Sequence, residues 1–298
     1  MDAAVSSITE LAPAKVNLAL HVTGRRADGY HLLESLVVFT RFGDRVSVEA
    51  SDEDRFSVSG PFADGVPADG GNLVVRARDG LRNAGGAETA RPVAIRLEKN
   101  LPVASGVGGG SSDAAAALRA LDRLWGLRLR ADELADIGLA LGADVPMCLT
   151  AKPLLARGVG DEISVMNDFP AHGLVLVNPG VAVSTPQVFA ALDRRDNAGL
   201  PPMPRIFDFH GLRNWLDATR NDLEPAARTL EPAVGHALAA LERAGAGFAR
   251  MSGSGATGFG LFETGNVAKR AAAELRGRHP DWFVAATRSI PSGADPND

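Results

Sequence analysis

The sequence predicts an α+β fold divided into two domains. Segments in which apolar residues alternate, as in strands, are interspersed with segments of helical spacing. They do not follow the regular strand–helix–strand order of a doubly wound parallel sheet, which favours the α+β class. The 298 residues suffice for two domains with a core each. We place the first domain at 1–160 and the second at 161–298.

The first predicted element is a strand at 14–22, AKVNLALHV. Its apolar and polar positions alternate, so that Val16 and Leu18 share one face while Lys15 and Asn17 share the other. Alternation of this kind is typical of a half-buried strand. Lys15 and Asn17 are therefore expected side by side on one face.

The later elements are predicted in order along the chain. The polar stretch 24–31 contains Asp28-Gly29 and predicts a turn. Residues 32–50 predict one or two strands with a turn at Gly43-Asp44. Further strands are predicted at 55–60, 93–102, 162–168, 173–180 and 282–289, and a strand–turn–strand unit at 247–263. Helices are predicted at 72–86, where paired glycines end the helix, and at 113–126, 184–192, 221–230, 234–246 and 266–278. A further helix begins at 131 and is predicted to stop near Gly142, with Pro146 marking the next turn. A proline-rich loop is predicted at 198–207 and a frayed polar tail at 291–298.

The composition argues against several classes of protein. Hydrophobic residues make up 45%, charged residues 22%, and the formal net charge is -5, which does not favour a general nucleic-acid binder. The single cysteine, Cys148, permits no internal disulfide and suits a reducing cytosol. The six histidines lack ligand spacing, so no His/Cys metal site is expected. Since no signal-peptide or membrane-span pattern occurs, we expect a cytoplasmic protein with no membrane partner. We also expect a monomer or weak homodimer with no nucleic-acid partner.

A glycine-rich segment is the strongest functional signal. Glycine occupies every position of 106–110 except Val107, and Ser111, Ser112 and an alanine-rich helix follow. Glycines let main-chain N–H groups turn inward, and a helix start adds unpaired N–H groups and a partial positive charge. A plain connector would not need so many residues that lose conformational entropy on folding. The junction therefore predicts a phosphate site.

This segment matches neither common nucleotide-binding loop. A P-loop requires a lysine after its last glycine, but none follows Gly110, and the nearest, Lys99, precedes the segment. In the dinucleotide fingerprint counted from Gly106, the third glycine would fall at Ser111. The literal G-x-G-x-x-G at 253–258 precedes a strand-like segment, so we interpret it as a hairpin turn.

Three segments resemble motifs of the GHMP kinase superfamily. Residues 102–118, PVASGVGGGSSDAAAAL, resemble its second motif, P-x-x-x-G-[LI]-G-G-G-S-S-x-A, with Ser105 and Val107 as small departures. Residues 13–36 resemble the first motif, and 249–262 the third. The further matches DGYH, GADVP, ARGVGDEI, NPGVAVSTPQVF and NDLEP resemble the branch whose substrate is a cytidine diphosphate-linked methylerythritol. The resemblance covers nearly the whole chain.

The resemblance implies a fold, an activity and a nucleotide site. The fold is the two-domain GHMP kinase fold, with an N-terminal ribosomal-protein-S5-like α/β domain and a C-terminal ferredoxin-like α+β domain. The activity is transfer of the γ-phosphoryl group of ATP to a tertiary hydroxyl. Asn72 is the candidate contact to adenine, Mg²⁺ is expected with the phosphates, and Ser112 is the candidate metal ligand. The ATP-binding residues would be Pro102, Val103, Ala104, Ser105, Gly106, Val107, Gly108, Gly109, Gly110, Ser111 and Ser112.

Two residues match the catalytic pair of the family. Asp144 in GADVP matches the general base, although the residues alone favour a capping or turn role ahead of Pro146. Lys15 in PAKVNL matches the catalytic lysine, which stabilises charge near the acceptor oxygen. Only four of the 31 basic residues are lysine, so a lysine on this strand is unusual. Asn17 would orient the hydroxyls or the diphosphate of the substrate.

The cytosine reader is also inferred from the resemblance. Tyr30, the only tyrosine, would stack on the base, and His31 would hydrogen-bond its edge. Phe189 would stack on the other face, with Thr185 and Pro186 near the ribose. Because stacking tolerates any base, discrimination against uracil must come from hydrogen bonds. From the residues alone, a core role for Phe189 at a helix start remains an alternative.

Two other functions stay open at this point. Another GHMP kinase, acting on a mevalonate-type substrate, homoserine or a sugar, would keep the loops but would not need DGYH or the aromatic residue of TPQVF. A non-catalytic nucleotide-binding regulator would keep the glycine segment but would not need both Lys15 and Asp144.

Overall fold

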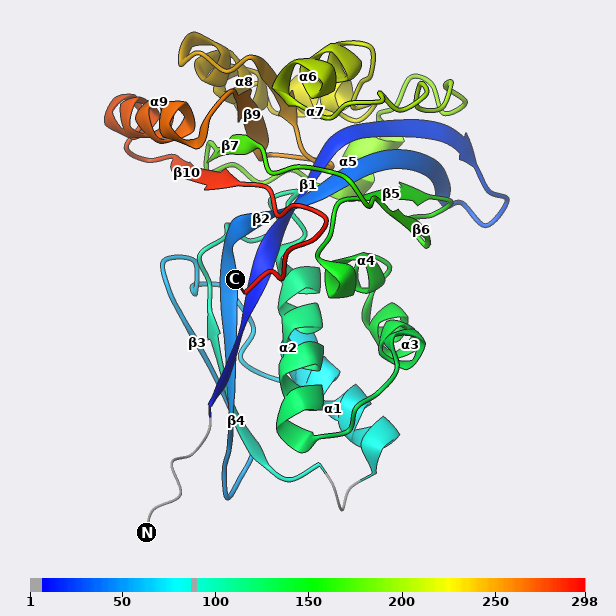
Figure 1. Ribbon diagram of the computed structural model, residues 1–298, viewed down its shortest axis with the longest axis vertical. Coiled ribbons are helices and arrows are strands. Elements are labelled where there is room, and N and C mark those ends of the chain that lie inside the picture. Colours follow the sequence, from blue (N-terminus) through cyan, green and yellow to red (C-terminus); the bar gives the residue numbers. More distant parts are fainter. Residues whose placement is uncertain (1–6, 87–89, 298) are drawn as a thin grey trace.

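The computed structural model describes residues 7–86 and 90–297. Its sheets and helices confirm the predicted α+β class. The strands are β1 (Ile8–Arg25), β2 (His31–Ala50), β3 (Arg55–Ser59), β4 (Val93–Glu98), β5 (Leu154–Arg157), β6 (Glu162–Val165), β7 (Gly173–Asn178), β8 (Phe248–Met251), β9 (Gly258–Phe262) and β10 (Phe283–Arg288). Figure 1 shows β7, β9 and β10 at one end of the molecule and β3 and β4 at the other, with β1 and β2 running between them. The helices are α1 (Leu73–Gly85), α2 (Gly109–Trp125), α3 (Ala131–Leu141), α4 (Val145–Thr150), α5 (Thr185–Ala190), α6 (Phe209–Asp217), α7 (Glu224–Leu230), α8 (Ala233–Arg243) and α9 (Gly265–Arg278).

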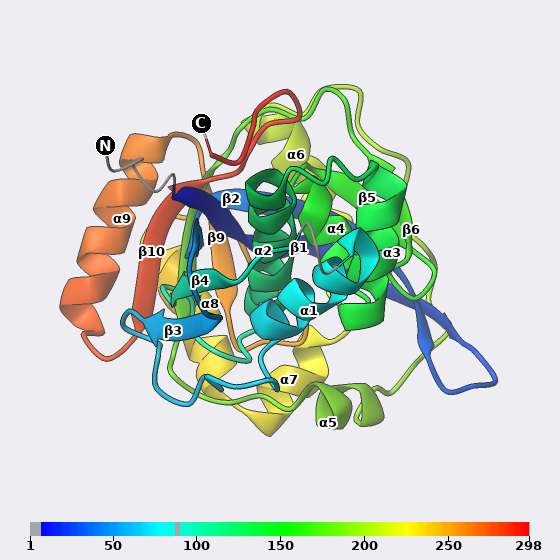
Figure 2. The ribbon, with the colours of Figure 1, turned by 90° about the horizontal axis from the view of Figure 1, so that it is seen from below.

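The two sheets differ in topology. Within the described residues, the N-terminal sheet has six strands in the order β3-β4-β2-β5-β6, with β1 antiparallel along β2. The C-terminal sheet has four strands in the order β10-β7-β9-β8, all antiparallel. Helices α1 and α2 pack in the N-terminal half, where α2 lies against β1 and β2, and α9 lies beside β10 (Figures 1 and 2).

A shared apolar cluster joins the two halves. In it, Leu18 of β1 and Leu36 of β2 pack with Leu176 of β7, Phe259 of β9 and Trp215 of α6, all of which are buried. Separate clusters lie under α1 and α2 in the N-terminal half and under α7, α8 and α9 in the C-terminal half. The middle of the long β1–β2 hairpin is therefore core for both halves.

The strand predicted at 14–22 is longer and more deeply buried than expected. It lies within β1, which has 18 residues. The half-buried prediction is wrong, because Lys15, Asn17 and His21 on the polar face are each less than a tenth exposed. Segments distant in sequence cover this second face: Asp144 at the start of α4 contacts Lys15, and Ala198 and Arg220 of the C-terminal half contact His21. A register shift between Asn17 and Ala19 bends the pairing with β2.

The turn predicted at Gly43-Asp44 is also wrong. β2 continues through both residues as one strand of 20 residues. Gly43 lies opposite Pro13 of β1, and a Cβ at Gly43 would lie 2.0 Å from the carbonyl oxygen of Ala12. Glycine at this position therefore permits the close approach of two strands.

Most other predicted elements are confirmed. Paired glycines end α1, and Gly142 ends α3, as the pattern predicts. The sequence patterns do not predict β5, which has four residues, or α6, which follows the proline-rich loop. Pro146, predicted to mark a turn, lies instead in the first turn of α4, where a missing N–H costs no helical hydrogen bond.

The C-terminal tail returns to the N-terminal half. Ile290 is buried in the N-terminal core, and the side chain of Asn297 accepts a hydrogen bond from Leu11 N at 2.8 Å. The predicted frayed tail is therefore wrong for the described residues 291–297, because these polar groups satisfy the end of β1. Like the tail, β6 follows residue 160 in the chain and yet lies in the N-terminal half, where it pairs with β5. The domain boundary at 160 stays a prediction.

No helix within the described ranges is long and apolar enough to cross a membrane.

Candidate active site

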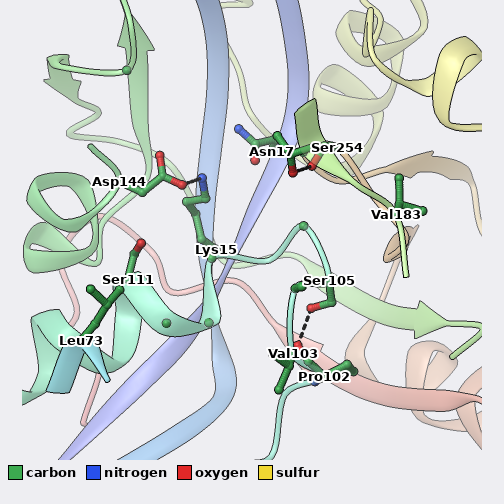
Figure 3. Close-up of a pocket in the computed structure, with 18 of the residues that line it drawn as sticks. Lys15, Asn17, Leu73, Pro102, Val103, Ser105, Ser111, Asp144, Val183 and Ser254 are labelled. Carbon is green, nitrogen blue, oxygen red and sulfur yellow. Dashed lines mark hydrogen bonds and ion pairs between the residues drawn. The ribbon is translucent and has the colours of Figure 1, made fainter. Parts of the chain in front are cut away.

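A cavity of about 750 Å³ opens where the two halves meet. It collects side chains from β1, the start of α2, the start of α4, α5 and the turn between β8 and β9 (Figure 3). The predicted site residues that line it are Lys15, Asn17, Asn72, Pro102, Val103, Ala104, Ser105, Gly106, Gly108, Gly109, Gly110, Ser111, Asp144, Thr185, Pro186 and Phe189. Segments distant in sequence thus meet around one space.

The glycine-rich loop enters α2 through left-handed backbone. Gly106 has φ +79° and Gly108 φ +65°, and Gly108 is the N-cap residue of α2. Such φ angles favour glycine because a residue with a Cβ would be strained there. The loop brings Gly109, Gly110 and Ser111, the first residues of the helix, to the cavity wall. Unpaired N–H groups and a positive helix end at a cavity wall form the geometry of an anion site.

The second glycine segment holds the first one in place. β8 and β9 pair as an antiparallel hairpin, which confirms the hairpin interpretation of 253–258. In this turn Thr257 N donates to Ser105 O at 3.0 Å, and Ser252 Oγ donates to Gly106 O at 3.0 Å. A Cβ at Gly106 would lie 2.6 Å from Ser252 O, so the two turns touch through backbone.

Lys15 and Asp144 form an ion pair in the cavity. Lys15 Nζ lies 2.6 Å from Asp144 Oδ2, with the lysine side chain 9% and the aspartate side chain 41% exposed. Asp144 is the N-cap residue of α4, yet its side chain makes no capping hydrogen bond within the described chain and turns toward Lys15 (Figure 3). Burial lowers the pKa of Lys15, but the Asp144 carboxylate opposes burial, and the net pKa lies above the usual value. The lysine is therefore a cation.

Asn17 presents an unpaired acceptor beside this pair. The Ser35 hydroxyl donates to Ala19 O at 2.7 Å, so it accepts from Asn17 Nδ2 at 2.8 Å, and this chain of bonds fixes the orientation of the amide. Asn17 Oδ1 is buried and has no hydrogen-bond partner among the described residues. A buried acceptor without a partner is costly, so a ligand donor in the cavity would satisfy it.

Two residues of the predicted ATP loop are turned away from the cavity. Val107 is 1% exposed and packs in the cluster that joins the halves, while its carbonyl accepts from Lys15 N at 2.9 Å. Ser112 is fully buried, and its hydroxyl donates to Pro13 O at 2.7 Å. The metal-ligand hypothesis for Ser112 does not fit this arrangement, because the hydroxyl is bonded to β1. Of the two adjacent serines, Ser111 is the one that lines the cavity.

Asn72 lines the cavity but uses its polar atoms within the chain. It caps α1, since its Oδ1 accepts from Val74 N at 2.9 Å, and its Nδ2 donates to Pro67 O at 2.8 Å. These bonds set Pro67 and Leu73 at the cavity wall. The sequence carries the signal for this role, because asparagine directly before an apolar helical run is a typical N-cap.

At the α5 end of the cavity lies one of the predicted cytosine readers, Phe189, whereas Tyr30 and His31 are not among the described residues that line it. Phe189 of α5 lines it, and the ring of His31 stacks on Phe189 with centroids 4.6 Å apart at 26°. His31 Nε2 is buried without a partner among the described residues, and burial, with Arg25 and Arg195, lowers the pKa of His31. Tyr30 is 65% exposed at the end of the hairpin turn, so the base sandwich is not assembled here.

Thr185 and Pro186, predicted near the ribose, also lie at this end. Thr185 Oγ1 lies 2.6 Å from Ser254 Oγ in the turn between β8 and β9. Both residues line the cavity at the start of α5, whose N-cap is Ser184. This contact joins α5 to the second glycine segment.

A buried charge cluster beneath the glycine loop was not predicted. Lys99 Nζ lies 2.5 Å from Asp44 Oδ2 and 2.7 Å from Asp113 Oδ2, and all three residues are less than 5% exposed. Asp44 Oδ1 also accepts from Leu101 N at 2.8 Å. Burial lowers the pKa of Lys99, but the two carboxylates raise it above its usual value; burial also holds the pKa of Asp113 well above its usual range. The scarcity of lysine was the available signal for Lys99.

The family of the chain follows from comparisons with known proteins. The family described as GHMP kinases N terminal domain matches residues 72–152, and GHMP kinases C terminal matches 206–281. The 4-diphosphocytidyl-2-C-methyl-D-erythritol kinase of Mesorhizobium japonicum is 68% identical over 99% of this chain and 100% of its own length. That of Brucella melitensis is 56% identical over 97% of each chain.

Solved structures agree with these sequence matches. A crystal structure of 4-(cytidine 5'-diphospho)-2C-methyl-D-erythritol kinase is similar with a TM-score of 0.77 and 34% identity, over 95% of this chain and 100% of the other. Homoserine kinase from Cytophaga hutchinsonii shares the fold, with a TM-score of 0.74 at 21% identity over 98% and 96% of the two chains. The chain therefore belongs to the GHMP kinases. Within them it belongs to the family of 4-diphosphocytidyl-2-C-methyl-D-erythritol kinases, as its sequence motifs implied.

Proposed function

We propose that the chain transfers the γ-phosphoryl group of ATP to the 2-hydroxyl of 4-diphosphocytidyl-2-C-methyl-D-erythritol, a step of the non-mevalonate isoprenoid pathway. Relatives that are 4-diphosphocytidyl-2-C-methyl-D-erythritol kinases, similar over nearly the full length of the chain, support this substrate. The observation that carries the chemistry is the contact of Lys15 and Asp144 at 2.6 Å in the cavity wall. A non-catalytic regulator would not need this pair.

Asp144 is the proposed general base. Its carboxylate accepts the proton of the acceptor hydroxyl as that oxygen bonds to the γ-phosphorus, while the bond to the bridging oxygen breaks and ADP leaves. Lys15 orients the carboxylate and stabilises the negative charge that develops on the acceptor and phosphoryl oxygens. The unpaired Oδ1 of Asn17 would accept a hydroxyl of the substrate.

The proposed nucleotide site is the first glycine loop with the start of α2. Main-chain N–H groups there suit the phosphates of ATP, which is the co-substrate of a kinase. Beyond them the wall is apolar, with Val66, Pro67, Leu73 and Val103, and suits an adenine ring. Asn72 contributes by holding this wall in place, since its own polar atoms are bonded within the chain.

Mg²⁺ is the proposed partner of the nucleotide. Among the described residues no group of three or more histidine, cysteine, aspartate or glutamate side chains is arranged to hold a metal ion. Since the described residues offer no such group, the ion would be held mainly by phosphate oxygens and water. No step above depends on it.

We place the protein in the cytoplasm as a monomer or weak homodimer. The single cysteine, Cys148, is buried, and burial raises the pKa of its thiol to about 12, which keeps it unreactive. A buried thiol beside the active site suits a reducing compartment.

A substrate panel tests the proposed activity. ADP release from ATP–Mg²⁺ is measured with 4-diphosphocytidyl-2-C-methyl-D-erythritol, mevalonate and homoserine, each offered separately. Turnover is expected with the first compound alone. Absence of turnover with it would overturn the proposal, and turnover with either other alcohol would redirect it to another GHMP kinase.

Removing the base is expected to abolish turnover without abolishing ATP binding. Asp144→Asn keeps the shape of the side chain but cannot accept the proton, so kcat should fall roughly 10²–10⁴-fold. ATP affinity is measured separately by calorimetry and should be retained. The matched control is Asp132→Asn on α3, whose exposed side chain pairs with Arg130 outside the cavity. Full activity in Asp144→Asn would exclude Asp144 as the base.

A further inference from the structure

A buried carboxylate lies directly behind the substrate end of the cavity. Asp222 precedes Leu223, which lines the cavity, and the Asp222 side chain is only 8% exposed. Its Oδ2 accepts from Val22 N of β1 at 2.6 Å and from Asn197 Nδ2 at 3.2 Å. Its Oδ1 accepts from Arg220 Nε at 2.6 Å. One side chain thus joins β1, the loop after α5 and the segment before α7.

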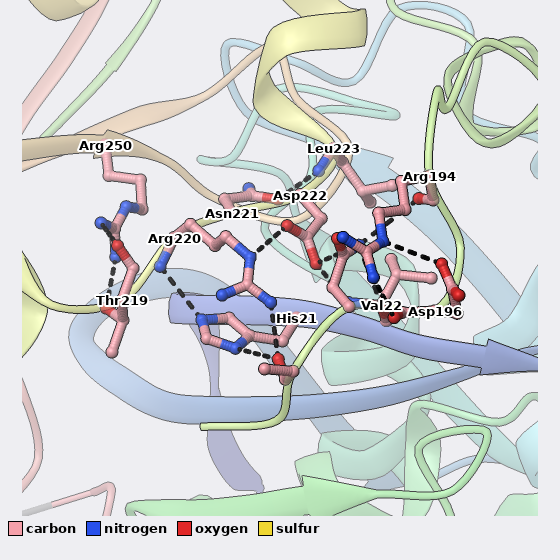
Figure 4. A network of polar contacts seen from close by, with 12 residues as sticks. His21, Val22, Arg194, Asp196, Thr219, Arg220, Asn221, Asp222, Leu223 and Arg250 are labelled. Atoms are coloured by element: carbon pink, nitrogen blue, oxygen red, sulfur yellow. Dashed lines mark hydrogen bonds and ion pairs between the residues drawn. The ribbon is translucent and has the colours of Figure 1, made fainter. Parts of the chain in front are cut away.

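His21 extends this network along β1. It is 1% exposed, and its Nε2 accepts from Arg220 N at 3.1 Å while its Nδ1 lies 3.1 Å from Ala198 O. Because Nε2 is an acceptor here, Nδ1 carries the proton and donates to the carbonyl. Arg220 reaches the same carbonyl at 2.6 Å. Figure 4 shows His21, Arg220 and Asp222 pointing toward one another.

The network ends on the two elements that carry the aromatic pair. The loop bonded by Asp222 and His21 follows α5, which carries Phe189. Its next residues reach β2, where Leu200 N donates to Glu34 Oε2 at 2.8 Å. His31, three residues before Glu34 at the start of β2, stacks on Phe189. The polar network, on the side of these elements away from the cavity, therefore fixes the distance between α5 and the β1–β2 hairpin.

We infer that Asp222 is a positioning residue for recognition of the cytidyl end of the substrate. It acts through the Asn197 loop and β1, which together set Phe189 against the hairpin that carries Tyr30 and His31. Burying charged side chains costs free energy unless they are well paired, so a cluster kept behind a cavity wall implies that the geometry it sets matters. The inference rests on the proposed function, because it assigns the substrate class to this end of the cavity.

The test is a split between the two Michaelis constants. Asp222→Asn keeps the shape but turns an N–H group toward one of the donors now bonded to the carboxylate. The KM for 4-diphosphocytidyl-2-C-methyl-D-erythritol should rise roughly tenfold, the size expected for one disrupted buried hydrogen bond to a charged group, while the KM for ATP stays within about twofold. The matched control is Asp217→Asn, whose exposed carboxylate pairs with Arg213 on α6.

A double-mutant cycle separates positioning from stability. If Asp222 acts through the aromatic pair, its effect on the cytidyl KM should largely vanish in a Phe189→Ala background. Asn197→Ala removes one arm of the network, should shift the same KM less, and serves if Asp222→Asn does not fold. Equal changes in both KM values, or additive effects in the cycle, would overturn the inference. Absence of wild-type turnover with this substrate would instead overturn the proposed function.

Discussion

The two ends of the cavity are built in different ways. At the nucleotide end, the glycine loop is bonded through backbone to the turn between β8 and β9, and Lys99 is buried between two carboxylates beneath it. At the cytidyl end, the candidate contacts are side chains. Tyr30 is 65% exposed, and His31 covers the ring of Phe189 at a centroid distance of 4.6 Å.

This difference follows from what each end has to bind. Phosphate oxygens are bound by main-chain N–H groups, whose positions are fixed once the backbone is fixed. A base is bound between aromatic side chains, which can rotate after the backbone is set. A base that stacks on the face of Phe189 now covered by His31 would have to displace that ring, because a stack at 4.6 Å leaves no gap for a third ring. We therefore expect the nucleotide end to be preorganised and the cytidyl end to be completed when the substrate binds.

Gly106→Ala is expected to have the largest effect on the nucleotide end of the cavity. Gly106 has φ +79°, and an added Cβ would lie 2.6 Å from Ser252 O and 2.7 Å from Gly255 O, which are backbone atoms that cannot rotate away. The two turns must separate, and a displaced phosphate loop should lower kcat/KM for ATP roughly 100-fold. Steady-state kinetics with ATP as the varied substrate checks this.

A glycine elsewhere provides the control for that variant. Gly277 on α9 has open space around an added Cβ, so Gly277→Ala should leave both Michaelis constants unchanged. If Gly106→Ala bound ATP with wild-type affinity, the nucleotide end would not depend on the close contact of the two turns.

Tyr30→Ala is expected to have a smaller effect, confined to the cytidyl end of the cavity. Loss of one stacking ring costs about 1–3 kcal/mol, so the KM for the cytidyl substrate should rise roughly 10- to 100-fold with the KM for ATP little changed. Tyr30→Phe keeps the ring and should restore most of the affinity. An unchanged cytidyl KM in Tyr30→Ala would mean that the exposed position of Tyr30 is also its position in the complex.

The sequence predicted the parts of the site that depend on local pattern. Alternation along residues 14–22 set Lys15 and Asn17 on one face, and both line the cavity. The run of glycines before a helix predicted the loop at the start of α2, because positive φ angles and a helix start are local properties. The α+β class followed from the order of such local patterns.

The parts that escaped prediction depend on contacts between distant segments. Lys99 meets Asp44 and Asp113 only because β2, β4 and α2 pack together, and nothing local to any of the three marks that meeting. The burial of the polar face of β1 also comes from outside the strand, since Asp144 contacts Lys15, and Ala198 and Arg220 contact His21. Periodicity shows which residues share a face but not what covers it.

The smallest expected effect is a pH-dependent change in the stability that His21 contributes behind the cytidyl end. Burial, with Arg220 adding to it and Asp222 opposing, lowers the pKa of His21, whereas in the unfolded chain the imidazole has its ordinary pKa near 6.5. As pH falls below about 6.5 the unfolded state binds a proton that the folded state excludes, so the stability contributed by neutral His21 is lost toward acid. The difference in urea midpoint between the wild type and His21→Gln, which cannot take up this proton, should therefore shrink between pH 8 and pH 5.5. A midpoint difference that stays constant over this range would show that the bonds of His21 to Arg220 and Ala198 do not hold the ring neutral.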